Sequence, residues 1–194
     1  KKEALPQYKK GLLQKLFPAS TPLSHQHIRS LSGVEGNIPE LRFPGFSGEW
    51  VEKRFGEILK QEIREIEKPS SLYLAIGVRS HSKGTFQKPN FDPAKIAMEK
   101  LYVVKENDLI VNITFAWEGA IAIVPKQDEG GLVSHRFPTY TFNSKVVMTE
   151  YFKNILHLRR LKLNLALISP GGAGRNRVMS KKDFLNMKWL IPSI

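Results

Sequence analysis

Residues 108–142 constrain the fold more than any other part of this sequence. Three apolar runs, at 109–111, 120–124 and 132–133, are separated by glycine and proline. The runs are rich in β-branched residues, which favour strands, and short apolar runs bounded by turn residues are typical of strands buried on both faces. The segment therefore predicts consecutive buried strands that form the core of a sheet.

Polar and aromatic residues occupy two of the connections around these runs. A sheet core alone does not require them, and polar groups held at the ends of rigid strands commonly form a binding surface. An ordinary sheet with polar loop ends is the alternative explanation for any one of them. The residues are Asn112, Thr114, Trp117 and Glu118 at the first connection, and His135, Arg136 and Tyr140 at the second.

The length and composition indicate one domain with an appendage. The chain has 194 residues, of which 41% are hydrophobic and 25% are charged, so it is long enough for one full-sized core and short for two. No apolar run approaches the roughly 18 residues that a membrane helix requires, so no membrane partner is expected. The chain has no cysteine, which excludes disulfides and thiolate metal sites and fits a reducing, cytoplasmic location.

The charge balance points to a polyanionic partner. Lysine and arginine number 30 against 18 aspartates and glutamates, for a formal net charge of +12. Nucleic acid is favoured over a membrane surface as the partner. The excess is regional, because residues 151–188 contain nine lysines and arginines and the single acid Asp183. A solvated basic face is the alternative interpretation.

The first part of the chain predicts an appendage followed by a linker. Residues 7–17 place leucines and aromatics on one helical face, which predicts a short amphipathic helix that Pro18 ends. Residues 19–37 are rich in Ser, Pro, Gly and His and lack periodicity, which is typical of a linker. We therefore divide the chain into a helical segment at 1–18, a linker at 19–37 and a domain at 38–194.

Hydrophobic periodicity and turn residues predict the remaining elements of that domain. The spacing of Ser180 and Asp183 is that of a capping box, which marks the start of a short helix. The other expected elements are a solvated surface segment at 57–68, a strand at 72–78, a polar loop at 79–84, a helix at 149–166 and a last strand at 189–192.

Residues 171–177, with the sequence GGAGRNR, form a glycine-rich loop that lets backbone approach a ligand closely while presenting two guanidinium groups. A dinucleotide-type cradle needs a strand before the glycines and a helix directly after them, whereas here a helix precedes and arginines follow. Glu118 lacks the second acid or base that acid-base catalysis needs, so an enzyme is not favoured. A fragment of an S-adenosylmethionine-dependent DNA methyltransferase and a general basic nucleic-acid-binding module are the alternatives.

Recognition of DNA is therefore the expected chemistry, and no metal site is expected. Arginine binds guanine edges or phosphates, asparagine binds adenine edges, and lysines at a helix start contact phosphates. We expect the loops at 79–83, 112–118 and 171–182 to contact the major groove and the flanking phosphates. The candidate DNA-binding residues are Arg79, His81, Lys83, Asn112, Thr114, Trp117, Arg136, Arg175, Asn176, Arg177, Lys181 and Lys182.

Several motifs taken together resemble the DNA specificity subunit of type I restriction-modification systems. The resemblance covers nearly everything from residue 38 onward. The motifs are LLQKLF at 12–17, PELRFPGF at 39–46 with Trp50, DLIV at 108–111 with GAIAIVP at 119–125, and Val133-Ser134 with FPT at 137–139.

The resemblance implies an α/β (α+β) fold: a twisted mixed-sheet target recognition domain with peripheral helices, preceded by a short piece of a conserved long helix. It also implies a non-catalytic role, in which the domain binds double-stranded DNA at one half of a bipartite site. The implied partners are a type I methyltransferase subunit and a type I restriction subunit. S-adenosylmethionine, ATP and Mg are then expected only in those partners, with no cofactor in this chain.

Overall fold

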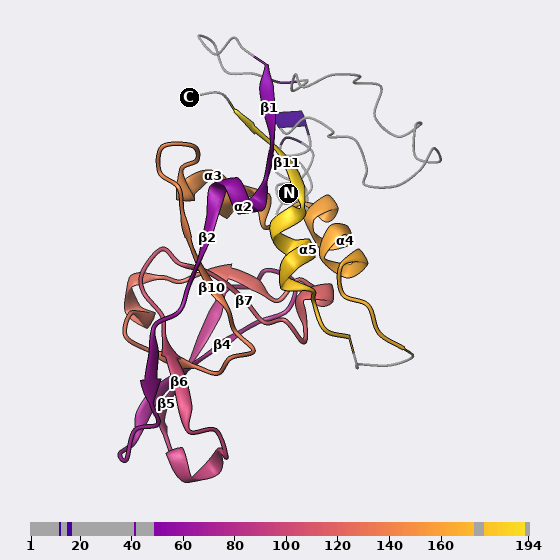
Figure 1. Cartoon of the computed structure of the whole chain (residues 1–194). Helices are drawn as coiled ribbons and strands as arrows, with labels where there is room; N and C mark the ends of the chain where they lie inside the picture. Colours follow the sequence, from indigo (N-terminus) through magenta and orange to yellow (C-terminus); the bar gives the residue numbers. More distant parts are fainter. Residues whose placement is uncertain (1–11, 13–14, 17–40, 42–48, 173–176, 193–194) are drawn as a thin grey trace, which may run out of the picture.

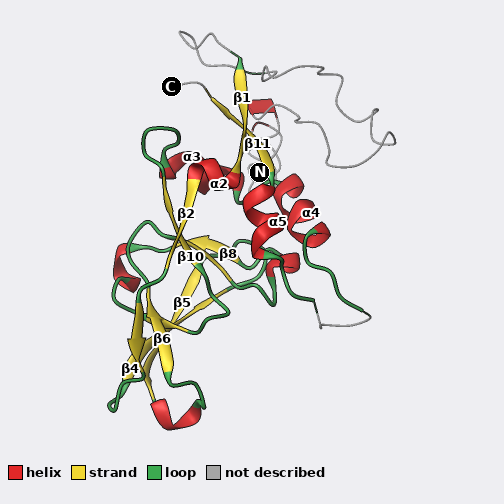
Figure 2. Cartoon of the chain, viewed as in Figure 1, coloured by secondary structure: helices red, strands yellow, loops and turns green. Residues whose placement is uncertain are grey.

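The described part of the chain contains three β-sheets with helices around one end (Figures 1 and 2). The computed structural model describes residues 12, 15–16, 41, 49–172 and 177–192. A two-stranded sheet pairs β1 (Trp50–Arg54) with β11 (Lys188–Pro192). The four-stranded sheet has the order β2 (Leu59–Glu62), β10 (Thr139–Phe142), β7 (Leu109–Val111) and β8 (Ile121–Ile123). The five-stranded sheet has the order β3 (Glu65–Glu67), β6 (Lys100–Val103), β9 (Leu132–Val133), β4 (Tyr73–Val78) and β5 (Thr85–Phe91).

The helices gather around the β1 and β11 pair in the upper half of Figure 1, and the five-stranded sheet lies in the lower half. The strand pairings are antiparallel except for β4 with β9, which are parallel and pair Ala75 with Leu132. The five-stranded sheet is therefore mixed, and this sheet together with the peripheral helices confirms the predicted α+β class. The helices are α2 (Phe55–Ile58), α3 (Thr149–Ile155), α4 (Arg159–Leu167) and α5 (Lys181–Asn186), and the 3-10 turns are η1 (Pro93–Lys95), η2 (Ala116–Glu118) and η3 (Lys126–Asp128).

Strand β7 is buried on both faces, which explains its uninterrupted apolar sequence. Successive side chains of a strand point to opposite faces. Leu109 and Val111 accordingly belong to the larger hydrophobic core under the helices, whereas Ile110 packs in a second core with Ile76 and Val133 of the five-stranded sheet. All three β7 side chains are fully buried. This strand therefore joins the two halves of the molecule.

The larger core is organised around Phe55, which begins α2. Its ring centroid lies 5.5 Å from that of Phe152 on α3 and 5.3 Å from that of Phe184 on α5. Such tilted and edge-on ring pairs add to the stabilisation that burial gives. Helices from three separate parts of the sequence are thereby fixed against one another.

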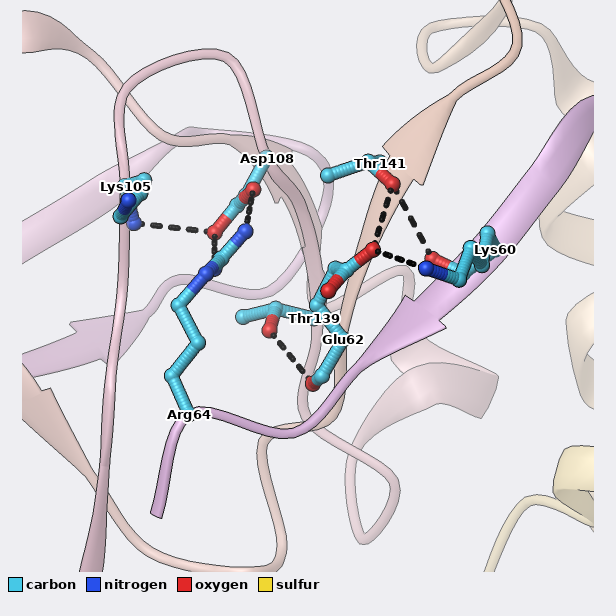
Figure 3. Close-up of polar contacts among 7 residues, drawn as sticks. All are labelled: Lys60, Glu62, Arg64, Lys105, Asp108, Thr139 and Thr141. Carbon is cyan, nitrogen blue, oxygen red and sulfur yellow. Dashed lines mark hydrogen bonds and ion pairs between the residues drawn. The ribbon is translucent and has the colours of Figure 1, made fainter. Parts of the chain in front are cut away.

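A buried ion pair ties the end of β2 to the start of β7 (Figure 3). Arg64 donates two hydrogen bonds to the Asp108 carboxylate, at 2.5 and 3.1 Å, and the Lys105 backbone N–H donates a third at 2.9 Å. The Asp108 side chain is 2% exposed and that of Arg64 is 20% exposed. Nearby, Glu62 accepts from Thr141 Oγ1 (3.2 Å), which joins β2 to β10. These polar contacts fix the chain as it passes from the four-stranded to the five-stranded sheet.

Most of the predicted strands are confirmed. The apolar runs of the central segment form β7, β8 and β9, although β9 joins the five-stranded sheet and the other two join the four-stranded sheet. The strand expected at 72–78 is β4, and the last strand is β11. The capping box is confirmed in part, since Ser180 Oγ accepts a hydrogen bond from the Asp183 N–H at the start of α5 (3.1 Å).

The prediction of one helix over 149–166 is wrong. The chain forms α3 and α4 with a break between them, because Leu158 adopts an extended backbone (φ −74°, ψ 131°) and caps α4. The break lets each short helix turn its own apolar residues to the core, Phe152 and Ile155 from the first, Leu161 and Leu165 from the second.

The segment 57–68 differs in part from its prediction, and most of the N-terminal appendage lies outside the described residues. β3 is exposed as expected, but the prediction of a solvated surface is wrong at Ile58 and Leu59, which are buried in the larger core. The segment also forms β2 and β3, which its alternating charges did not indicate. Leu12, Lys15 and Leu16 are helical, while most of 1–18 and all of 19–37 lie outside the described residues. Among the described residues, no helix combines the length and the apolar character that crossing a bilayer demands.

Candidate nucleic-acid interface

The turn between β4 and β5 lies against the loop that follows β7. The His81 backbone N–H donates to Glu118 O (2.9 Å), and the Ser82 N–H donates to Gly119 O (2.8 Å). His81 and Ser82 have positive φ angles, of 62° and 53°, a conformation that costs non-glycine residues about 1–3 kcal/mol each. The two hydrogen bonds therefore hold a strained turn in one place on the neighbouring loop.

Side chains of this turn connect it to helix α4. Ser82 Oγ donates to Leu156 O (2.7 Å), just before the helix, and Lys162 Nζ lies 3.2 Å from His81 Nδ1. Because an ammonium group can only donate, His81 Nδ1 is the acceptor in this contact. The turn thus brings a helix lysine and a turn histidine together, although the two residues are 81 positions apart.

The loop after β7 holds Thr114 beside Arg136. Asn112 Oδ1 accepts from the Thr114 N–H (3.1 Å), and Thr114 O accepts from Trp117 Nε1 (3.2 Å). Arg136 approaches from the neighbouring connection: its backbone O accepts from the Ile113 N–H (3.0 Å), and its guanidinium lies 3.4 Å from Thr114 Oγ1. Arg136 is exposed, so its charge is presented at the surface of this loop.

Arg177 fastens the end of α4 to the same loop. Its guanidinium donates to Ala166 O (2.7 Å) and to Ser169 O (3.0 Å), which satisfies carbonyl groups at the C-terminal end of the helix. The guanidinium carbon lies 5.3 Å from the centre of the Trp117 ring, a cation–π contact. Arg177 therefore has a structural role in addition to the predicted DNA contact, which stays a prediction.

These contacts form one continuous chain across loops that are far apart in the sequence. The group carries three permanent positive charges and a histidine, and the acid beside it is Glu118, whose Oε2 accepts from Ser80 Oγ (2.7 Å). Cationic side chains on loops that a rigid sheet supports are the usual means of binding a phosphate backbone. We refer to the group as the loop cluster; it consists of His81, Thr114, Trp117, Arg136, Lys162 and Arg177.

Comparison with solved structures identifies the fold. A scan against protein-family models and a search of curated proteins gave no match. The chain is similar to the HsdS subunit from Thermoanaerobacter tengcongensis, with a TM-score of 0.58 and 16% identity over 77% of this chain and 39% of that one. It is also similar to a chain in a structure that describes complex assembly and conformational transition of the type I R-M system, with a TM-score of 0.56 and 15% identity over 78% of this chain and 39% of that one.

The chain has the fold of an HsdS target recognition domain. It spans about two fifths of the length of the subunits that it matches.

The other predicted DNA-binding residues that the structure describes are not members of the loop cluster. Asn112 is 9% exposed and supports its own turn. Arg79 lies over the Phe86 ring (5.2 Å) and donates to Thr85 O. The remaining residues are Lys83, exposed in the β4–β5 turn, Lys181 and Lys182, at the start of α5, and Arg175 and Asn176, outside the described residues.

Sequence reasoning missed Lys162 as a site residue. It lies in a basic run with Arg159 and Arg160, and the run gives no indication of which charge faces the loops. The structure separates them: the Arg160 guanidinium lies over the Trp189 ring (4.3 Å), where burial lowers its pKa to about 10. The Lys162 ammonium group instead contacts His81 Nδ1. Its position on the helix, one residue after the buried Leu161 and three before the buried Leu165, places it beside the buried face, which by itself does not indicate a contact with the loops.

Of the glycine-rich loop, Gly171, Gly172 and Arg177 are described, and 173–176 lie outside the described residues. Gly171 and Arg177 pair as an isolated antiparallel bridge between α4 and α5, so a helix and not a strand leads into the glycines. Within the part of the chain that the structure describes, no group of three or more His, Asp or Glu side chains could hold a metal ion.

Proposed function

We propose that this chain binds double-stranded DNA in a sequence-specific manner, as one target recognition domain of a type I specificity subunit. The observation that carries the proposal is the loop cluster, in which contacts link the turn at 79–84, the loop at 112–119, Arg136 and α4, and which includes three cationic side chains. The fold similarity supports the same assignment. Net charge alone would not distinguish DNA from other polyanions.

The loop cluster offers two kinds of contact with a duplex. Arg136 and Lys162 are exposed and suit phosphate oxygens, whereas Thr114 and the guanidinium of Arg136 can also donate to base edges in the major groove. Phosphate contacts fix the position of the protein on DNA, and base-edge contacts select the sequence. One cluster can therefore supply both affinity and selection.

The role in a larger complex belongs to the same proposal. The domain would bind one half of a bipartite site and position a methyltransferase subunit and a restriction subunit there, without catalysing a reaction itself. S-adenosylmethionine, ATP and Mg would act in those partners. The chain spans only part of the matched subunits, so the second half-site would need a further recognition domain.

Competition binding over a salt series tests the proposal. If two or three cluster cations neutralise phosphates of B-DNA, the logarithm of the association constant should fall with the logarithm of the salt concentration with a slope of about −2 to −3. Random duplex should compete better than single-stranded RNA, and titration with S-adenosylmethionine should give no heat. Equal competition by RNA would favour a general basic module, and heat with S-adenosylmethionine would favour a methyltransferase fragment.

A further inference from the structure

A cavity of about 600 Å³ lies between the five-stranded sheet and the loop after β7. Its position is distinct from the loop cluster, although Ser80 and Glu118 belong to loops that border both. Much of its wall is aromatic, which suits the flat faces of a planar ligand. The aromatic lining residues are Tyr73, Phe86, Phe91, Phe115 and Phe137.

One wall of the cavity is built by close packing on a glycine. The Phe86 ring lies directly over Gly77 of β4, where an added Cβ would come within 2.3 Å of a ring carbon. Only glycine lets the ring sit that close to the strand. The ring therefore forms a wall of the cavity beside β4.

Asn112 contributes an unused hydrogen-bond donor to the cavity. The side chain is 9% exposed and lines the cavity. Its Oδ1 accepts from the Thr114 N–H (3.1 Å), which fixes the orientation of the amide and identifies the other terminal atom as Nδ2. Among the described residues, Nδ2 has no acceptor within hydrogen-bond distance. In the part of the molecule that the structure describes, the buried side-chain atoms without a partner are Asp128 Oδ2 and Tyr140 OH, so Asn112 Nδ2 still reaches the open cavity, where a ligand can accept from it.

Glu118 supplies the complementary group. Its Oε2 accepts from Ser80 Oγ (2.7 Å), and within the described chain Oε1 has no donor. The residue lines the same cavity as Asn112. An ionised carboxylate can only accept, so a ligand that satisfies both residues has one acceptor and one donor on its polar edge.

Lys88 adds a positive charge from the β5 strand. Its Nζ lies 5.5 Å from the centre of the Phe86 ring and 6.0 Å from that of Phe91. The residue is exposed and also lines the cavity. The cavity thus combines aromatic faces, a donor and acceptor pair, and an exposed cation that suits a phosphate.

We propose that this cavity binds a nucleotide, with the base between the aromatic side chains, its polar edge at Asn112 and Glu118, and its phosphate near Lys88. Each of the four DNA bases presents an acceptor and a donor on its Watson–Crick edge. The nucleotide could be free or could be a base extruded from a bound duplex. The inference goes beyond the proposed function, since the loop cluster would contact paired DNA from outside.

The test is NMR titration of the full ¹⁵N-labelled chain with the four 2′-deoxynucleoside 5′-monophosphates. Asn112→Asp keeps the Oδ1 acceptor for the Thr114 N–H and removes the Nδ2 donor. We expect at least one mononucleotide to shift cavity resonances and Asn112→Asp to bind it about tenfold more weakly. The control is Asn143→Asp. Asn143 Oδ1 accepts from the Lys145 N–H (3.2 Å), the same hydrogen-bond pattern in an exposed turn outside the cavity. The nucleotide affinity of this variant should equal that of the wild type.

A second variant and a second ligand complete the experiment. Phe115→Leu removes one aromatic ring from the cavity lining and leaves the hydrogen bond between Asn112 Oδ1 and the Thr114 N–H in place. This variant should also weaken nucleotide binding. It keeps the proposal testable if Asn112→Asp alters the loop structure. A duplex with one bulged nucleotide, compared with the same duplex fully paired, distinguishes an extruded base from a free nucleotide. If the bulged duplex binds more tightly and Asn112→Asp removes this preference, the ligand is an extruded base. If neither duplex is preferred, the ligand is a free nucleotide.

The proposal is overturned if millimolar mononucleotides shift no cavity resonance, if shifts occur only in the loop cluster, or if Asn112→Asp and the wild type bind equally. Because the titration contains no paired duplex, such a failure leaves the proposed DNA-binding function standing. Conversely, nucleotide binding without any binding of paired duplex would contradict the proposed function and leave the cavity assignment standing.

Discussion

Replacement of Asp108 by Asn is expected to lower the free energy of unfolding by about 3–5 kcal/mol, because removing one partner of a buried ion pair leaves the other charge uncompensated. Asp108 is 2% exposed, and Arg64 donates to both of its oxygens. Asparagine has nearly the same shape but no charge, and its amide nitrogen replaces one of the two accepting oxygens, so the variant removes the charge together with at least one hydrogen bond. Urea denaturation followed by circular dichroism measures the change.

A matched surface pair controls for this effect. Lys100 and Glu65 form an ion pair between β6 and β3 of the five-stranded sheet, and their side chains are 55% and 37% exposed. Lys100→Met should therefore change stability far less than Asp108→Asn, because exposed pairs contribute little. The double replacement Arg64→Met with Asp108→Leu should cost less than the sum of its single replacements. A loss below about 1 kcal/mol for Asp108→Asn would contradict the structural role given to this pair.

Replacement of both Arg136 and Lys162 by Gln is expected to weaken binding of duplex DNA by about 100-fold. Each charge-assisted contact with phosphate contributes about 1.5 kcal/mol, which is about tenfold in affinity. The salt dependence should also flatten, with the slope reduced by roughly 2. Arg177 is a poorer choice for this experiment, because its guanidinium also holds the end of α4. Fluorescence anisotropy with a labelled duplex at several salt concentrations provides the measurement.

The control removes the same charge from another part of the surface. Lys153 on α3 pairs with Glu150 (2.7 Å), and Lys188 on β11 pairs with Glu52 (2.8 Å). Replacing them by Gln should change affinity by less than about threefold, since long-range effects of exposed charges are screened. Equal losses in the two double variants would mean that net charge, and not the loop cluster, determines affinity.

The strands of the central segment were predictable because their signal is local. The runs at 109–111 and 120–124 are apolar without interruption, which follows from burial on both faces. β2 and β3 have the sequences LKQE and EIE. Their charges conceal the strands, because β2 pairs with a strand about 80 residues away and β3 with one about 35 residues away. The break at Leu158 was likewise hidden, because helical periodicity continues across it and tertiary packing decides where the chain turns.

The candidate site was predictable in part for the same reason. Thr114, Trp117 and Arg136 follow strand ends, so their place on loops could be inferred from the sequence. That the turn at His81 lies on the loop at Glu118 depends on how the two larger sheets pack, which no local pattern encodes. Asn112 was predicted to bind an adenine edge, yet its side-chain Oδ1 accepts a hydrogen bond from the Thr114 N–H of the same turn. Lys162 became a site residue only through the contact with His81.

The most direct test of sequence-specific recognition is selection of bound duplexes from a random pool by the full chain, followed by sequencing. The account predicts enrichment of one short motif by the wild type, and loss of that enrichment in the Arg136→Gln, Lys162→Gln variant while the Lys153→Gln, Lys188→Gln variant retains it. A pool that stays random after repeated selection with the wild-type chain would contradict the account.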